Sequence, residues 1–248
     1  MKKPVIIIVS IMAIYIFVML FIFTILPGIM YTTIVLEDNV RWRYSKDGWR
    51  NYDPKAELNG YKIYNPNNGD YVGKYDIQYT NKGWFVKVNR EFKLYDKSML
   101  AVKSNKFKAY NFEIETLTDN TIITSILNKA SLKATDGATV GNQIQIDLDN
   151  DGSSEIIYGI TNMDEMGNVR FYVMAIYIDG GYKIIKKVTG DNVPSIYVYS
   201  IVDFDRDSNL ELIVKESYFS MSGCDYSLYS LVDGEYKLMI STGGSLWN

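Results

Sequence analysis

Hydrophobic and polar positions divide the chain into an apolar first segment and a long region of alternating residues. Residues 5–26 carry no charge, and about 20 apolar residues in a helix cross the hydrocarbon core of a bilayer. A cleaved signal peptide has a shorter apolar region, about 7–15 residues, and is the alternative, as is a buried core helix. We expect residues 1–30 to form a cytoplasmic tip and an uncleaved transmembrane anchor. Lys2 and Lys3 favour a cytoplasmic N-terminus, which places the C-terminal domain outside the cell.

From residue 31 onward, short segments in which polar and apolar residues alternate predict β-strands. Turn-forming residues such as Lys46-Asp47-Gly48 separate these segments and predict hairpins. The expected strands of the first half are residues 32–36, 40–45, 49–52, 61–64, 75–79, 83–88 and 91–95.

One later segment has a different period. Ile122, Ile123, Ile126, Leu127 and Ala130 recur at the spacing of one helix face. We therefore expect a short helix near residues 121–132, with its apolar side in the core.

An acidic nine-residue segment occurs twice. Asp147–Glu155 reads D-L-D-N-D-G-S-S-E, and Asp203–Glu211, 56 residues downstream, reads D-F-D-R-D-S-N-L-E. The acids at positions 1, 3, 5 and 9 are the same in both. A second match follows each copy, at residues 179–183 and 233–237. Two motifs that recur in the same order indicate an internal repeat.

Four carboxylates so close together would repel one another without a cation. Oxygen ligands at this density suit Ca²⁺, which takes 6–8 oxygens at about 2.3–2.6 Å. An EF-hand is excluded because position 12 is Tyr158 in one copy and Val214 in the other, and because the flanking residues read as strands. Two solvated acidic turns are the alternative, since Asp, Asn and Gly are common in turns.

Acidic loops of this form between strands resemble the FG-GAP/VCBS-type calcium-binding repeat of integrin-like β-propellers. The resemblance covers about residues 141–240 and implies two bound Ca²⁺ ions. It implies carboxylate ligands at four loop positions and a backbone carbonyl at position 7. The second loop departs from the pattern, because Ser208 stands where glycine is usual. The implied ligands are Asp147, Asp149, Asp151, Ser153 and Glu155 in the first loop, and Asp203, Asp205, Asp207, Asn209 and Glu211 in the second.

Composition narrows the chemistry. The chain has no histidine, which excludes a Ser-His-Asp triad and histidine-ligated zinc. Cys224 is the single cysteine, so no intrachain disulfide can form. Residues 31–140 have a net charge of +4 and residues 141–248 a net charge of −9, which argues against nucleic acid as a partner.

The expected fold class is mainly β. One N-terminal transmembrane helix precedes an antiparallel β-sheet ectodomain that contains two propeller-blade-like repeats and the short helix. Two blades cannot close a ring, which takes about 4–8. Divergent blades upstream and assembly of several chains remain alternatives, but we favour a packed sheet arrangement. The expected domains are residues 1–30, a β-rich membrane-proximal domain at 31–138, and the repeats at 139–248.

These features predict a membrane-anchored cell-surface protein whose calcium-binding ectodomain is a non-enzymatic interaction or adhesion module. Its partners would be the membrane and another surface protein or a wall polysaccharide. An alternative is carbohydrate or wall-polymer binding by Trp42, Trp49 and Trp84. Two Tyr-[Ser/Thr]-x-x-Gly-Trp segments, at 44–49 and 79–84, instead favour cross-strand packing for Trp49 and Trp84. A carboxylate-based hydrolase is the third possibility, although no acid pair outside the two loops suggests one.

Overall fold

A computed structural model describes the chain from residue 32 to residue 242 with several gaps. The apolar segment at residues 5–26 and the loop residue Asp205 lie outside the described residues. Within the described part, no helix has the length and the apolar character that a membrane span needs. The described residues are 32–36, 40–45, 48–51, 58–80, 82–95, 97–104, 106–133, 138–190, 193–204, 206–218 and 224–242.

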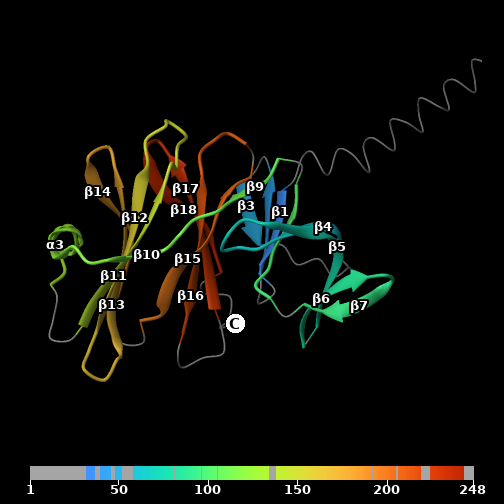
Figure 1. Ribbon diagram of the computed structural model, residues 1–248, viewed down its shortest axis with the longest axis horizontal. Helices are drawn as coiled ribbons and strands as arrows, with labels where there is room; N and C mark the ends of the chain where they lie inside the picture. Colours follow the sequence, from blue (N-terminus) through green and yellow to red (C-terminus); the bar gives the residue numbers. More distant parts are fainter. Residues whose placement is uncertain are drawn as a thin grey trace, which may run out of the picture.

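Strands make up most of the described chain, and they form three antiparallel sheets (Figure 1). The N-terminal sheet has eight strands in the order β3-β2-β1-β8-β4-β5-β6-β7. The three sheets together confirm the expected mainly β, antiparallel fold, with one helix in the described residues. The strands are β1 (Thr32–Leu36), β2 (Arg41–Ser45), β3 (Gly48–Asn51), β4 (Leu58–Tyr64), β5 (Tyr71–Thr80), β6 (Gly83–Val88), β7 (Glu91–Leu94) and β8 (Leu100–Lys103).

The two acidic repeats each form one five-stranded sheet. The first repeat sheet has the order β10-β11-β12-β13-β14, and the second repeat sheet has the order β18-β17-β16-β15-β9. In both, the acidic loop joins the first two strands of a four-stranded meander. The strands are β9 (Lys108–Tyr110), β10 (Glu115–Leu117), β11 (Ala138–Ile146), β12 (Glu155–Met163), β13 (Val169–Ile178), β14 (Gly181–Thr189), β15 (Ser195–Asp203), β16 (Glu211–Ser217), β17 (Cys224–Val232) and β18 (Glu235–Ser241).

The expected boundary near residue 138 does not coincide with a boundary between sheets. β9 pairs with β15 through Ala109 and Val202, and β10 pairs with β11 through Thr116 and Asn142. The sheets of the repeats therefore include strands that lie before residue 138 in the sequence.

The second repeat sheet is the middle layer of the molecule, between the first repeat sheet and the N-terminal sheet (Figure 1). Leu212 and Val214 of β16 pack toward the first repeat sheet, whereas Ile213 packs toward the N-terminal sheet. This explains why six consecutive residues of β16 are buried, because a strand covered on both faces has no solvent side. β18, at the sheet edge, is mostly exposed.

Helix α3 (Asn120–Lys129) covers the outer face of the first repeat sheet (Figure 1). Asp119 caps it by accepting hydrogen bonds from the backbone N–H groups of Thr121, at 2.7 Å, and Ile122, at 3.4 Å. Ile126 and Leu127 are buried against the sheet, as the helical spacing predicts. These backbone hydrogen bonds also hold the pKa of the Asp119 carboxyl below its usual range.

Candidate metal centre

The first acidic loop brings three carboxylates together. Asp147, Asp149 and Asp151 each offer one carboxylate oxygen, and these oxygens all lie within 4.8 Å of one another. Among the residues that the structure describes, no other group of three acids meets this condition. The grouping follows from alternation, since positions 1, 3 and 5 of a tightly turned loop direct their side chains to one side.

The backbone of the first loop turns sharply at two residues with positive φ. Asn150 has φ of 58° and Gly152 has φ of 90°. Two carboxylates hold the turn by accepting backbone hydrogen bonds. The N–H of Gly152 donates to Asp147 Oδ2 at 3.1 Å, and the N–H of Ser153 donates to Asp151 Oδ1 at 2.7 Å. The loop is therefore organised by the same side chains that would bind a cation.

Glu155 closes the first loop from its far end. Its side chain is buried, and Oε2 accepts a hydrogen bond of 2.7 Å from the backbone N–H of Leu148. Burial raises the pKa of the Glu155 carboxyl, the nearby charges of Asp149 and Asp147 raise it further, and the Leu148 hydrogen bond opposes this rise. A bound divalent cation would favour the ionised form that burial and repulsion disfavour.

One carboxylate oxygen of Asp147 lacks a hydrogen-bond donor. Its Oδ1 atom is buried and has no hydrogen-bond partner among the described residues. A buried carboxylate oxygen without a donor costs free energy, of the order of 1–3 kcal/mol. A cation beside Oδ1 would remove this cost, so the donor set fits a hard divalent ion.

The second loop has positive φ at the same two positions as the first. Arg206 has φ of 62° and Ser208 has φ of 76°, at the positions of Asn150 and Gly152. The departure from glycine at Ser208 thus leaves the turn in place. A residue with a Cβ atom in this left-handed region is strained by roughly 1 kcal/mol.

The described acids of the second loop do not form a group like that of the first loop. Asp203 and Glu211 are buried, Asp207 is exposed and Asn209 is half-buried. Asp203 Oδ1 accepts a hydrogen bond from the N–H of Arg206. The structure does not bring three described acids of this loop within 4.8 Å, and Asp205 lies outside the described residues. A second cation site, and the carbonyl ligands at Ser153 and Asn209, stay predictions.

Exchanging the residues at loop position 6 tests this backbone conformation. We expect Gly152→Ala to lower the free energy of unfolding by roughly 1 kcal/mol, because no neighbouring atom lies within 4 Å of the added Cβ and only the positive φ opposes it. Ser208→Gly should raise the free energy of unfolding by up to about 1 kcal/mol. Urea unfolding measures both, and equal signs for the two variants would contradict the matched turns.

Tyr236 adjoins both loops, and the sequence did not assign it a role. Its hydroxyl donates a hydrogen bond of 2.8 Å to the backbone carbonyl of Leu210. Burial holds the pKa of Tyr236 well above its usual range, and the charges of Glu211, Glu155 and Asp149 add to the rise. The repeated Asp-Gly-x-Tyr-Lys segments were the signal, because they place a tyrosine at the same point of each repeat.

The tryptophans proposed as sugar platforms are mostly in the core. Trp42 is fully buried and Trp84 is 5% exposed, which corrects the sugar-binding expectation at these two positions. Trp49 is half-buried and packs on Tyr44, with ring centroids 5.1 Å apart. Each Tyr–Trp segment therefore forms a cross-strand pair beside a hairpin turn, with Tyr79 and Trp84 as the second pair.

Comparison of the chain with protein-family models, with curated proteins and with solved structures gives no match.

Proposed function

We propose that this protein is a membrane-anchored surface protein whose two FG-GAP/VCBS-like repeats bind Ca²⁺ and present a non-enzymatic interaction surface. The observation that carries the proposal is the first loop, where oxygens of Asp147, Asp149 and Asp151 lie within 4.8 Å of one another and Asp147 Oδ1 is buried without a donor. Asp147, Asp149, Asp151 and Glu155 would hold the ion. Ca²⁺ fits this donor set because it prefers carboxylate and carbonyl oxygens.

The arrangement in the fold suggests what bound Ca²⁺ would do. In each repeat sheet, the acidic loop and the turn of one β-hairpin lie at the same end (Figure 1). The hairpin is β13–β14 in the first repeat sheet and β17–β18 in the second. The side chain of Lys183 links the two hairpins by donating to the carbonyl of Gly234 at 2.7 Å. Cations in the loops would therefore fix one continuous end of the molecule, and metal bound only by the folded state stabilises that state.

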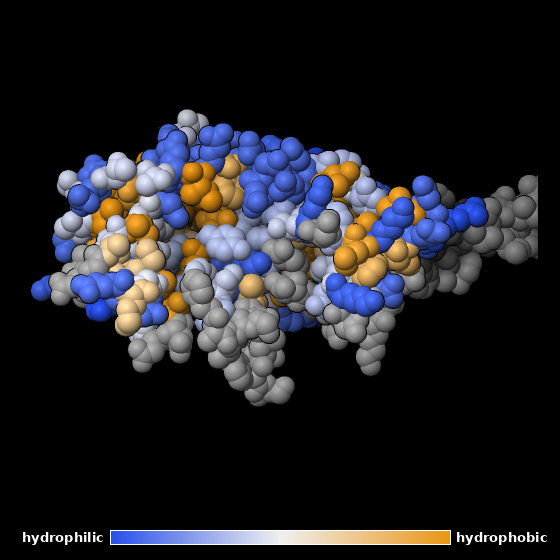
Figure 2. Space-filling model, turned by 60° about the horizontal axis from the view of Figure 1, so that its bottom comes forward, coloured by the Kyte–Doolittle hydropathy of each residue, from blue (hydrophilic) through white to orange (hydrophobic). Residues whose placement is uncertain are grey.

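The end of the molecule opposite the acidic loops comes forward in Figure 2, where hydrophobic residues appear in small groups between hydrophilic ones. Large exposed hydrophobic residues are scattered over different parts of the chain, as with Leu94 in β7, Ile114 in the connection between β9 and β10, and Leu238 in β18. Scattered single residues are normal for a protein surface. The loop end, with its carboxylates, is the surface that a change in Ca²⁺ concentration would alter.

Membrane attachment is the second part of the proposal, and it is supported by the uncharged segment at residues 5–26. Lys2 and Lys3 would keep the N-terminus in the cytoplasm and the repeats outside. Extracellular modules bind Ca²⁺ with dissociation constants of about 10⁻⁴–10⁻³ M, so loops of modest affinity would be occupied there.

A binding assay on isolated cell envelopes tests the interaction role. The full protein should be retained in millimolar Ca²⁺ and released by EGTA. The Asp147→Ala plus Asp203→Ala variant should not be retained. Equal retention with Ca²⁺ and with EGTA would contradict a calcium-dependent interaction module.

A further inference from the structure

Strands β5, β6 and β7 form an arm at one end of the N-terminal sheet, on the far side of the molecule from the first repeat sheet (Figure 1). One face of the arm belongs to the core, where Ile77 of β5 and Val86 of β6 are paired and buried. Side chains alternate between the two faces of a strand. The residues next to this pair therefore lie on the opposite face, which we call the outer face of the arm.

The outer face of the arm carries a small apolar group. Phe85 of β6 is paired with Leu94 of β7, and the neighbouring pair on this face is Lys87 with Phe92. Leu94 is 54% exposed, and both phenylalanines are half-buried. None of the three belongs to a core cluster of the described residues. Leu94 is therefore not an isolated residue, because residues paired across two strands contact each other.

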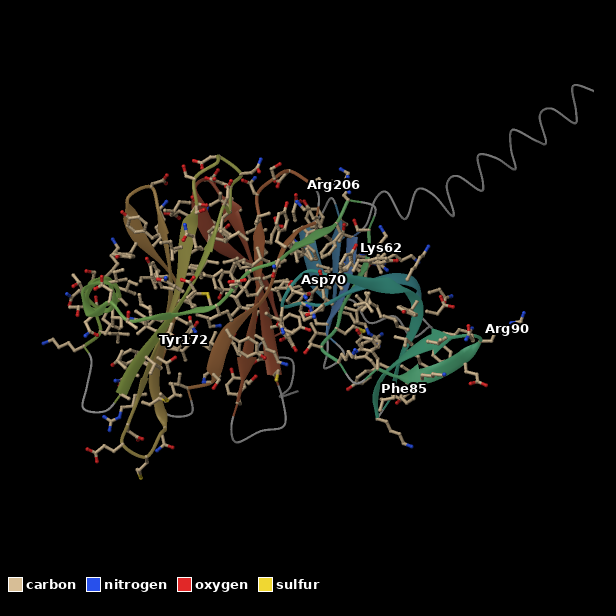
Figure 3. All side chains as sticks on the ribbon, in the orientation of Figure 1. Lys62, Asp70, Phe85, Arg90, Tyr172 and Arg206 are labelled. Atoms are coloured by element: carbon tan, nitrogen blue, oxygen red, sulfur yellow. The ribbon has the colours of Figure 1, made fainter. Side chains whose placement is uncertain are left out.

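The arm also has an excess of positive charge. Residues 71–95 contain five Lys and Arg and two Asp and Glu, a net charge of +3. Lys74 is exposed on the outer face, and Arg90 is exposed in the turn between β6 and β7, at the tip of the arm in Figure 3. Asp76 lies 4.0 Å from the ammonium of Lys87, so its charge is offset within the arm. The outer face is therefore both apolar and basic.

The repeats leave the arm uncovered. Val102 of β8 pairs with Lys62 of β4, and Lys62 pairs with Lys74 of β5, so these three side chains lie on one face of the sheet. Val102 is buried against the second repeat sheet, whereas Lys74 is exposed. The outer face of the arm thus continues a packed face beyond the edge of the second repeat sheet.

The expected membrane anchor would hold the N-terminal sheet close to a bilayer. The uncharged segment ends at residue 26, and β1 begins the sheet at Thr32. The five residues between them span at most about 18 Å, because an extended chain covers about 3.3–3.6 Å per residue. The N-terminal sheet is therefore the part of the ectodomain that this short connection keeps beside the lipid.

We propose that the outer face of the arm docks on the anionic bilayer in which the protein is anchored. Leu94 and the two phenylalanines enter the headgroup region, while Lys74, Lys87 and Arg90 lie beside lipid phosphates. Anionic lipids attract basic side chains near the surface, and buried apolar area adds to the binding. This inference rests on the proposed anchor. It adds that the lipid orients the ectodomain and so fixes the direction in which the loop end faces.

A fluorescent label at position 94 tests the docking in the full protein reconstituted into vesicles. Leu94→Cys carries an environment-sensitive label, and Cys224→Ser removes the single native thiol. The vesicles contain phosphatidylcholine alone or equal parts of phosphatidylcholine and phosphatidylglycerol, with some lipid spin-labelled at the headgroup. We expect the spin label to quench the fluorescence at least about twofold more strongly in the anionic vesicles, because they attract the basic arm.

Leu238→Cys, also made with Cys224→Ser, is the matched control. Leu238 lies on β18 of the second repeat sheet and is 55% exposed, almost the same as Leu94. Its label should be quenched to the same extent in both kinds of vesicle. Equal quenching at position 94 in the two kinds of vesicle, or the same increase at both positions in anionic vesicles, overturns the docking.

Two double variants test the contribution of the basic side chains. Lys74→Gln plus Arg90→Gln should weaken the docking equilibrium by about fivefold for each lost charge. Lys129→Gln plus Lys237→Gln removes the same charge from exposed positions of the repeats and should leave the quenching unchanged. Equal loss in the two double variants overturns the arm as the docking surface. Circular dichroism checks that both fold.

Salt and an alkaline wash distinguish this inference from the proposed anchor. In about 1 M salt, where the Debye length is about 3 Å, the label at position 94 should lose its extra quenching while the protein stays in the vesicles. Retention of the protein without extra quenching in low salt overturns only the docked arm. Release of the native protein from phosphatidylcholine vesicles by alkaline carbonate overturns the proposed anchor, and the inference with it.

Discussion

Adding about 10 mM Ca²⁺ to the metal-free protein should raise its melting temperature by roughly 5–20 °C. Loops with dissociation constants of about 10⁻⁴–10⁻³ M would each gain about 1.4–2.7 kcal/mol at that concentration, because the ion binds the folded state. In a chain of this size each kcal/mol shifts the melting temperature by roughly 2–4 °C. Differential scanning calorimetry of the same sample with and without Ca²⁺ measures the shift.

The acidic loops must be the source of that shift. EGTA should reverse it, and Asp147→Ala plus Asp203→Ala should abolish it. Glu165→Ala plus Glu235→Ala removes the same amount of charge from exposed positions outside the loops and should leave the shift unchanged. An identical melting temperature with and without millimolar Ca²⁺ in the native protein would count against the metal sites.

A buried ion pair between the two repeat sheets carries the second large expected effect. Lys186 of β14 contacts Glu216 of β16, and the two side chains are 17% and 8% exposed. Lys186→Met should lower the free energy of unfolding by about 3–5 kcal/mol, because it leaves the buried Glu216 without its counter-ion. Tyr172, which Figure 3 shows among the strands of the first repeat sheet, and Tyr229 lie close to Glu216. Burial raises the pKa of both tyrosines, and the negative charge of Glu216 adds to the rise.

Two further variants distinguish the cost of an unpaired buried charge from the effect of simply removing a lysine side chain. Lys186→Met combined with Glu216→Gln removes both charges and should recover much of the lost stability. Lys237→Met removes a lysine from an exposed pair with Asp233 and should have almost no effect, since exposed pairs contribute little. If urea unfolding showed equal losses for Lys186→Met and Lys237→Met, the buried pair would not hold the repeats together.

Much of the fold follows from local patterns. The alternating segments and the repeated acidic loops correctly indicate antiparallel sheets, and Ile122, Ile126 and Leu127 indicate α3. The attachment of β9 and β10 to the repeats could not be predicted in this way. Each of these two strands has only three residues, too few for a visible period, and their partners lie far along the chain.

The candidate site was predictable for the same reason that it is compact. Asp147, Asp149 and Asp151 are close in sequence, so their spacing alone places their oxygens together. The backbone hydrogen bond from the N–H of Leu210 to the carbonyl of Leu148 connects the two loops across 62 positions of sequence. Because it joins backbone atoms of two apolar residues, no side-chain pattern predicts it. The burial of Trp42 and Trp84 likewise depends on how β2 and β6 pack, which aromatic content alone does not reveal.

Anomalous diffraction from crystals of the protein grown in millimolar Ca²⁺ tests the central claim most directly. The account predicts a calcium peak about 2.3–2.6 Å from carboxylate oxygens of Asp147, Asp149 and Asp151, and a second peak beside Asp203 and Glu211. Well-ordered loops with no peak at the first position would contradict it.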